Sequence, residues 1–230
     1  MGLQGDNYKT AAQREAFFER LEERLRGLPA IQQVSLSSSN PVWGFNSSGG
    51  IVIEGQPEPA PGQYPEAFFE PVSTQYFATL GAHLIAGRNF AATDAADHPE
   101  VLIINEAMAR RFWPNENPLG KRIGRPDPDR HWREIVGVVR DMSFPGRLDE
   151  PYTRLQIFRP LAQAPPNWMT ISLRTSTSPE ALANTVRRTV AEIDPTQPVN
   201  QIRSARSLWI RDWEICLCWE RYWVLLPVSD

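Results

Sequence analysis

The stretch VLIINEAMARRFWP, residues 101–114, decides the fold. Its apolar opening, residues 101–105, predicts a strand, and Asn105 can cap the helix that follows by accepting a hydrogen bond from the first turn. Pro114 ends that helix, because proline cannot continue it. A second apolar run, EIVGVVRDM at residues 134–142, is typical of a strand covered on both faces. Strand–helix–strand is therefore the centre of the chain.

Each end of the chain pairs a long amphipathic helix with short strands. The spacing of apolar residues predicts helices over 11–28 and from Ser178 onward, the second with Pro179 in its first turn and Ser178 as its side-chain cap. A short helix is expected within STQYFATLG, capped by Ser73 and closed by Gly81. The apolar stripes of the two long helices are Phe17, Phe18, Leu21, Leu25 and Leu28 in the first, and Leu182, Val186, Val190 and Ile193 in the second. Further strands are expected at 31–38, 51–55, 155–161, 168–175 and from 199. This order predicts an α+β fold with one subdomain inserted into another.

Charge and hydropathy exclude several classes of function. The net charge is −3, with acids and bases interspersed, so no basic block exists that could neutralise a run of phosphates. We therefore expect no nucleic-acid partner. No apolar leader and no run of about 20 apolar residues is visible, so we expect a soluble chain without a signal peptide or transmembrane segment.

Metal ligands and catalytic groups do not cluster in the sequence. Cys216 and Cys218 form a C-x-C with no histidine nearby to complete a zinc site. His83, His98 and His131 are far apart, and the loop DHPE around His98 favours a solvated turn. We therefore expect no metal site.

Nucleophiles and phosphate loops are also missing. The chain contains neither G-x-S-x-G nor S-x-x-K. Gly120-Lys121-Arg122 resembles the tail of a phosphate loop but lacks the earlier glycine and the following hydroxyl, so a turn into a strand is favoured. The scattered acids, Asp94, Asp97, Asp127, Asp129, Asp141, Asp149 and Glu150, are interpreted as loop residues. We therefore predict no catalytic and no cofactor-binding residue, and no enzyme.

Aromatic residues leave one alternative open. Their spacing favours core packing over a ligand cleft, although a surface for hydrophobic cargo remains the alternative. The residues concerned are Phe17, Phe18, Phe68, Phe69, Tyr76 and Phe77.

Several motifs in one order resemble a known family. EAFFEPVSTQYFATLGAHLIAGRNFAATD, VLIINEAMARRFWPNENPLGKRI and EIVGVVRDM are similar to the MacB-like periplasmic core domain of FtsX/MacB-type ABC transporter permeases, in particular the duplicated orphan permeases. A final S-P-E-A-L-A helix followed by D-P-x-x-P-V fits the same order. The resemblance covers residues 8–206.

The resemblance implies a two-lobed domain without chemistry of its own. A porter-like lobe would hold about residues 8–83 and 146–206, and a smaller inserted α/β lobe would hold about 84–145. The domain would lie on the extracytoplasmic, periplasmic side of the cytoplasmic membrane and pass ATPase-driven motion to export or envelope substrates. Its expected partners are the permease transmembrane helices, a separate ABC ATPase subunit and a second permease protomer.

The last residues depart from the family. Residues 207–230 are rich in tryptophan, and charged residues interrupt every apolar run there. Two interpretations stand: a truncated or frame-shifted product, or an amphipathic tail with Trp209/Trp213 and Trp219/Trp223 on helical faces.

For the domain as a whole, the alternative function is a free-standing periplasmic binding or chaperone-like protein that uses a cleft between the lobes.

Overall fold

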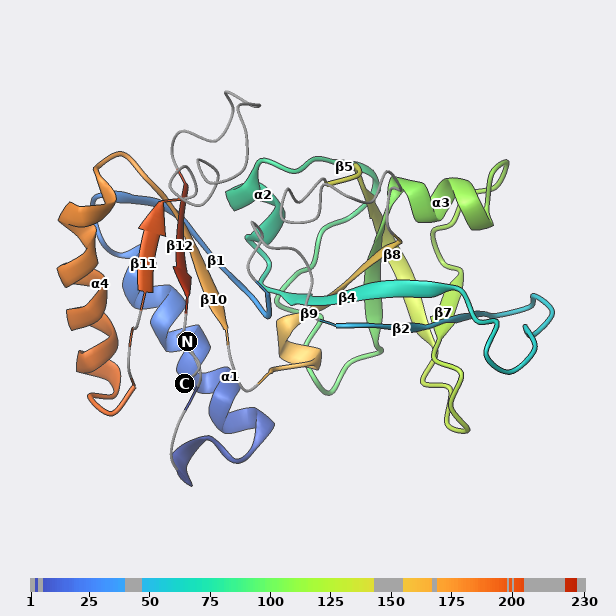
Figure 1. Ribbon diagram of the computed structural model, residues 1–230, viewed down its shortest axis with the longest axis horizontal. Coiled ribbons are helices and arrows are strands. Elements are labelled where there is room, and N and C mark those ends of the chain that lie inside the picture. Colours follow the sequence, from blue (N-terminus) through green and yellow to red (C-terminus); the bar gives the residue numbers. More distant parts are fainter. Residues whose placement is uncertain are drawn as a thin grey trace.

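The structure, a computed structural model, describes residues 3, 6–39, 47–142, 155–166, 169–197, 199, 201–204 and 222–226. Within them, twelve strands form one mixed sheet. The strands follow the order β11-β12-β10-β1-β4-β9-β6-β8-β7-β3, with β2 beside β4 and β5 beside β8. Helices cover this sheet, so the α+β class expected from the sequence is confirmed (Figure 1).

The first four strands of that order, with two long helices, make up what we call the terminal half. The helices α1 and α4 lie side by side (Figure 1), and their apolar stripes share one core with β1 and β10. Because β1 and β10 are antiparallel and each strand alternates, Val34 and Leu36 face this core, whereas Ser35 and Ser37 face the other way. The elements are α1 (Ala11–Arg26), β1 (Ile31–Ser37), β10 (Thr170–Thr175), α4 (Pro179–Ile193), β11 (Gln201–Ser204) and β12 (Tyr222–Leu226).

Helix α1 forms where the sequence predicts it and begins with a full capping box. The backbone N–H of Gln13 donates to Thr10 Oγ1 at 3.2 Å, and that of Thr10 donates to Gln13 Oε1 at 3.0 Å. The expected stripe is confirmed, since Leu21 and Leu25 are fully buried. The helix also carries an ion pair between residues four positions apart, with Arg26 and Glu22 2.8 Å apart.

The remaining strands, which we call the central half, form a continuous piece of the chain. Parallel pairing joins β4 to β9 and β6 to β8, and β9 runs antiparallel to β6. The apolar strand at residues 101–105 is buried along its whole length, as the centre of a sheet requires. The elements are β2 (Ser48–Gly50), β3 (Val52–Ile53), β4 (Glu66–Val72), α2 (Tyr76–Leu80), β5 (Leu84–Gly87), β6 (Val101–Asn105), α3 (Glu106–Phe112), β7 (Arg122–Gly124), β8 (Arg133–Val139) and β9 (Gln156–Pro160).

The two halves join at a short seam, the β1–β4 pairing. Ser37 and Val72 are its one paired position, whereas β4 and β9 pair over five. A backbone hydrogen bond of 3.1 Å, from Ser38 N to Pro71 O, flanks that pair. The short helix α2 packs against β1 and β10 across the seam, so the halves share more than one strand pair.

One predicted helix cap is wrong, and another is confirmed in its position but not in its hydrogen bond. Ser73 does not cap α2, whose cap position is Gln75; instead, Ser73 Oγ accepts a hydrogen bond of 3.0 Å from the backbone N–H of Leu36 across the seam. Ser178 does occupy the cap position of α4, but its side chain makes no capping hydrogen bond. The prediction that Gly81 closes α2 is confirmed by its left-handed φ of 71°.

The lobe boundaries of the sequence analysis stay a prediction. The sheet runs through both predicted lobes, since β9 of the porter-like lobe pairs with β6 of the inserted lobe.

Residues 222–226 form strand β12 between β10 and β11, so the helical interpretation of the tail is wrong for this segment. The other tail tryptophans and both cysteines lie outside the described residues.

Candidate functional site

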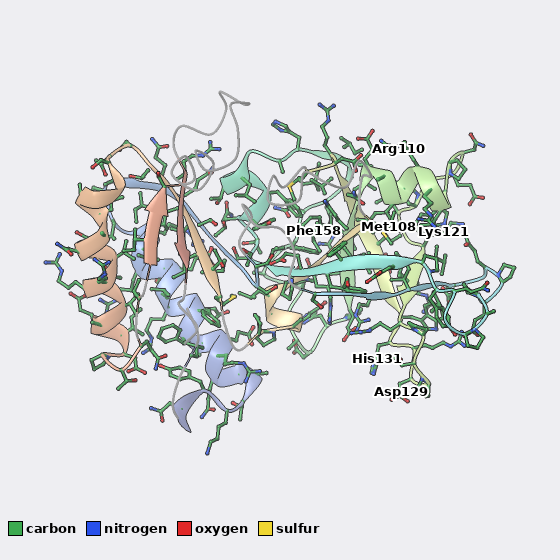
Figure 2. The ribbon with its side chains drawn as sticks, viewed as in Figure 1. Met108, Arg110, Lys121, Asp129, His131 and Phe158 are labelled. Carbon is green, nitrogen blue, oxygen red and sulfur yellow. The ribbon has the colours of Figure 1, made fainter. Side chains whose placement is uncertain are left out.

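The residues considered as metal ligands or catalysts do not come together. Among the described residues, no three His, Cys, Asp or Glu side chains gather where they could hold a metal ion. His98 Nδ1 lies 2.8 Å from Asp97 Oδ1, and both side chains are exposed. Figure 2 shows Asp129 and His131 at the tip of the loop between β7 and β8. These residues are separate surface groups.

The segment that resembles a phosphate loop is a turn, as predicted. Gly120 has a φ of 80°, and Lys121 leads into β7 with its ammonium group 3.0 Å from Glu116 Oε2. Figure 2 shows Lys121 below α3, on which Arg110 lies. The lysine thus has a carboxylate partner within its own turn.

The side chain of Asn105 does more than cap α3; it is a structural hub that bonds to three segments of the chain. Its Oδ1 accepts hydrogen bonds from Met108 N at 3.3 Å, which caps α3 as predicted, and from Gln156 N at 3.1 Å. Its Nδ2 donates to Asp141 Oδ1 at 2.8 Å. One side chain thereby ties α3, β9 and the end of β8 together.

Glu70 is a carboxylate buried beside the seam. Its side chain is fully buried in β4, where Ser39 N donates to Oε1 at 2.8 Å and Ser38 Oγ donates to Oε1 at 3.1 Å. The hydroxyl of Ser39 donates to the other oxygen, Oε2. Burial raises the pKa of Glu70 to about 7, although these hydrogen bonds oppose the shift. The group therefore titrates close to neutral pH.

Three arginines surround a cavity next to the seam, which we call the arginine pocket. It has a volume of about 340 Å³ and lies among β4, β7, β8 and β9. Arg125, Arg133 and Arg159 line it, together with the apolar side chains of Phe69 and Pro71. The sequence analysis did not single out these arginines. The available signal was Arg159 in the mostly apolar strand LQIFRPL, because buried strands rarely carry a charge.

The segments that flank the two long helices are tied together. The hydroxyl of Tyr8, which precedes α1, donates to Asp194 Oδ2 at 2.5 Å, directly after α4. Hydrogen bonds from Thr196 and from Tyr8 lower the pKa of Asp194 to about 2, and burial raises the pKa of Tyr8. The segments that precede α1 and follow α4 thus meet at one place.

The sequence matches one family over most of its length. The profile of the MacB-like periplasmic core domain matches residues 4–189. No helix within the described part of the chain has the length and apolar character that crossing a bilayer requires.

Two curated relatives carry the name macrolide export ATP-binding/permease protein MacB. The protein from Aggregatibacter actinomycetemcomitans is 25% identical over 210 residues, which are 90% of this chain and 31% of the relative. The protein from Mannheimia succiniciproducens is 26% identical over 143 residues, which are 61% of this chain and 21% of the relative. The chain therefore spans less than a third of either relative.

Solved structures share the fold. The periplasmic region of MacB from Actinobacillus actinomycetemcomitans aligns with a TM-score of 0.53 at 18% identity, over 75% of this chain and 72% of that one. The extracellular domain of the ABC-type transporter YknZ from Gram-positive bacteria gives 0.52 at 16% identity, over 78% and 84%. A domain of a putative permease from Porphyromonas gingivalis gives 0.52 at 14% identity, over 90% and 80%. At these identities the likeness concerns the fold alone.

Proposed function

Because this chain belongs to the family of MacB-like periplasmic core domains, we propose that it works as the non-catalytic, extracytoplasmic domain of an ABC transporter permease. The match over residues 4–189 carries the proposal. The domain would pass movement driven by a separate ABC ATPase to export or envelope substrates. Its partners would be the permease's transmembrane helices, that ATPase and a second permease protomer.

The tie between the start of α1 and the end of α4 supports a mechanical role. A membrane helix joined before the domain would act on a segment that is already bound to the end of α4, since Tyr8 and Asp194 are hydrogen-bonded. Movement applied there would reach α1, which packs on β1, and from β1 it would cross the seam to β4. We propose that the two halves tilt against each other at the seam, where one residue pair joins the strands.

A disulfide across the seam tests this mechanism. Ser37 and Val72 form a non-hydrogen-bonded antiparallel pair, because the flanking backbone hydrogen bonds run between their neighbours. Such positions bring Cβ atoms close enough for a disulfide. The variant Ser37→Cys/Val72→Cys would be placed in a chain whose Cys216 and Cys218 are replaced by serine, and assayed within the intact permease.

The oxidised variant should hydrolyse ATP but export substrate at a fraction of the rate of the same protein after reduction. The reduced form is the matched control, because it differs by one covalent bond alone. Equal export rates before and after reduction would contradict tilting at the seam.

The proposal that this chain is a permease domain has its own test, the genomic sequence on both sides of this reading frame. If no permease helices are encoded there in any frame, that proposal fails.

The arginine pocket favours a second candidate, a periplasmic binding protein. Charged and apolar side chains converge on one cavity, which is the arrangement expected of a ligand site. The two candidates differ in their readout. A binding protein would retain its ligand affinity in the purified chain, whereas a mechanical domain is active only within the assembled permease.

A further inference from the structure

The charge around the arginine pocket is unbalanced. Arg133 Nε lies 2.6 Å from Glu100 Oε2, and Arg159 lies 3.8 Å from the other oxygen of Glu100. Arg125 has no carboxylate partner within the described part of the chain; its guanidinium lies over the ring of Phe69, 5.4 Å from the centroid. Among the described residues, Glu100 is the one carboxylate paired with these three arginines, so the pocket carries an excess of positive charge.

One arginine also keeps a buried donor without an acceptor. The Nε of Arg159 is buried and lacks a hydrogen-bond partner among the described residues, whereas the buried Nε of Arg133 lies 2.6 Å from Glu100 Oε2. A buried donor without an acceptor is costly, more so when it is charged. Burial and the neighbouring Arg133 lower the pKa of Arg159 to about 10. A bound anion would supply the missing acceptor to Arg159 and would reduce the repulsion between the arginines.

The shape of the cavity limits what the anion can be. A volume of about 340 Å³ lies at the lower end of the range for small-molecule sites. Its walls combine the guanidinium forks, which suit planar or tetrahedral oxyanions, with the apolar faces of Phe69, Pro71 and Pro166. These walls fit a compact molecule with one charged and one apolar end.

We propose that the arginine pocket binds a small organic anion, whose carboxylate or phosphate group lies against Arg159 and Arg125 and whose apolar body lies against Phe69 and Pro71. Ser38 and Pro71, at the seam, line the same cavity as the arginines of β8 and β9. Occupancy therefore holds the end of β1 and the strands of the central half against one another. The site does not depend on the mechanical role; it names the ligand class of the second candidate function and can be tested in the isolated chain.

Titration calorimetry on the purified 230-residue chain tests the site, with phenyl phosphate, benzoate and inorganic phosphate as probes and benzyl alcohol as the uncharged reference. Phenyl phosphate or benzoate should bind saturably, and more tightly than inorganic phosphate, while benzyl alcohol should not bind. Arg159→Met should weaken binding about 10- to 100-fold, as expected for a charge-assisted hydrogen bond. The exposed Arg125→Gln should weaken it as well, and this second variant covers the case in which Arg159→Met does not fold.

Arg24→Met is the matched control, because Arg24 is an exposed arginine on α1 whose partner is Glu192 of α4, in the terminal half. It should bind the probes as the unmodified chain does. Absence of saturable binding of either organic anion up to about 10 mM would overturn the proposal. Equal loss of affinity in Arg24→Met and Arg125→Gln would overturn it too, since the effect would then be one of net charge.

Discussion

Replacing Glu70 with glutamine should remove a pH dependence of stability that this carboxylate creates. The side chain is fully buried, and its pKa in the folded protein is about 7, against an ordinary value of 4.5. Since the folded state holds the proton more tightly than the unfolded state, the contribution of Glu70 is fully present below about pH 4.5 and is lost as the pH rises through about 7. Glutamine has the same shape and stays neutral throughout.

The size of the effect follows from the two pKa values. A change from 4.5 to about 7 on folding corresponds to about 3 kcal/mol, at about 1.4 kcal/mol per pKa unit. The stability of Glu70→Gln minus that of the unmodified chain should therefore increase by about 3 kcal/mol between pH 4.5 and pH 8. The hydrogen bond that Ser39 N gives to Oε1 can be kept by the amide oxygen of the glutamine.

Urea unfolding followed by circular dichroism at half-unit steps from pH 4.5 to pH 8 measures that difference. Subtracting the two proteins cancels the titration of every other group. Glu66→Gln is the matched control, because Glu66 lies on the same strand but is exposed, and its difference from the unmodified chain should stay flat. A flat difference for Glu70→Gln as well would refute the assignment of a near-neutral pKa to Glu70.

Two further substitutions probe the backbone and the hub in the same unfolding assay. Gly87→Ala should cost about 3 kcal/mol or more, because φ is 72° and an added Cβ would lie 2.2 Å from a backbone carbonyl oxygen; Gly62→Ala, with a φ of 82° and nothing within 4 Å, should cost about 1 kcal/mol. A similar cost for both would contradict the steric argument. Asn105→Ala should cost about 2–4 kcal/mol, since it removes a helix cap and leaves a buried backbone N–H of β9 unpaired, whereas the exposed Asn117→Ala should cost less than about 1 kcal/mol. If the two asparagine variants were equally stable, Asn105 would have no role as a hub.

Sequence patterns predicted the helices and their caps well where interactions between residues close in the sequence determine them. The stripes of α1 and α4 repeat every three or four residues and became the shared core of the terminal half. Asn105 begins α3 and Gly81 ends α2, each through hydrogen bonds to residues within four positions, so the local sequence carries that information. Ser73 looked equally suitable as a cap, yet its hydroxyl accepts from Leu36, which lies 37 positions away. No local pattern contains such a partner.

The features of the candidate site were harder to predict, because each depends on the order of strands in the sheet. Glu70 lies in a stretch that reads as an ordinary alternating strand, and its donors, Ser38 and Ser39, precede it by about thirty residues. Arg133 and Arg159 come together because β9 inserts between β4 and β6, with β8 on the far side of β6. A sequence read segment by segment cannot show this neighbourhood, although it does predict the family, which the match over residues 4–189 confirms.

The division of the sheet into two halves also determines the order in which the strands can pair while the chain is synthesised. The strands of the central half all lie between residues 48 and 160, so none of them waits for a segment beyond residue 160. Strand β1 and helix α1 emerge first, yet their partners β10 and α4 end at residues 175 and 193. At translation rates of roughly 5–20 residues per second, the apolar stripe of α1 stays exposed for roughly 10–30 s, until α4 has been synthesised. During that interval the nascent chain exposes Phe17, Phe18 and Leu21, which are buried in the folded protein.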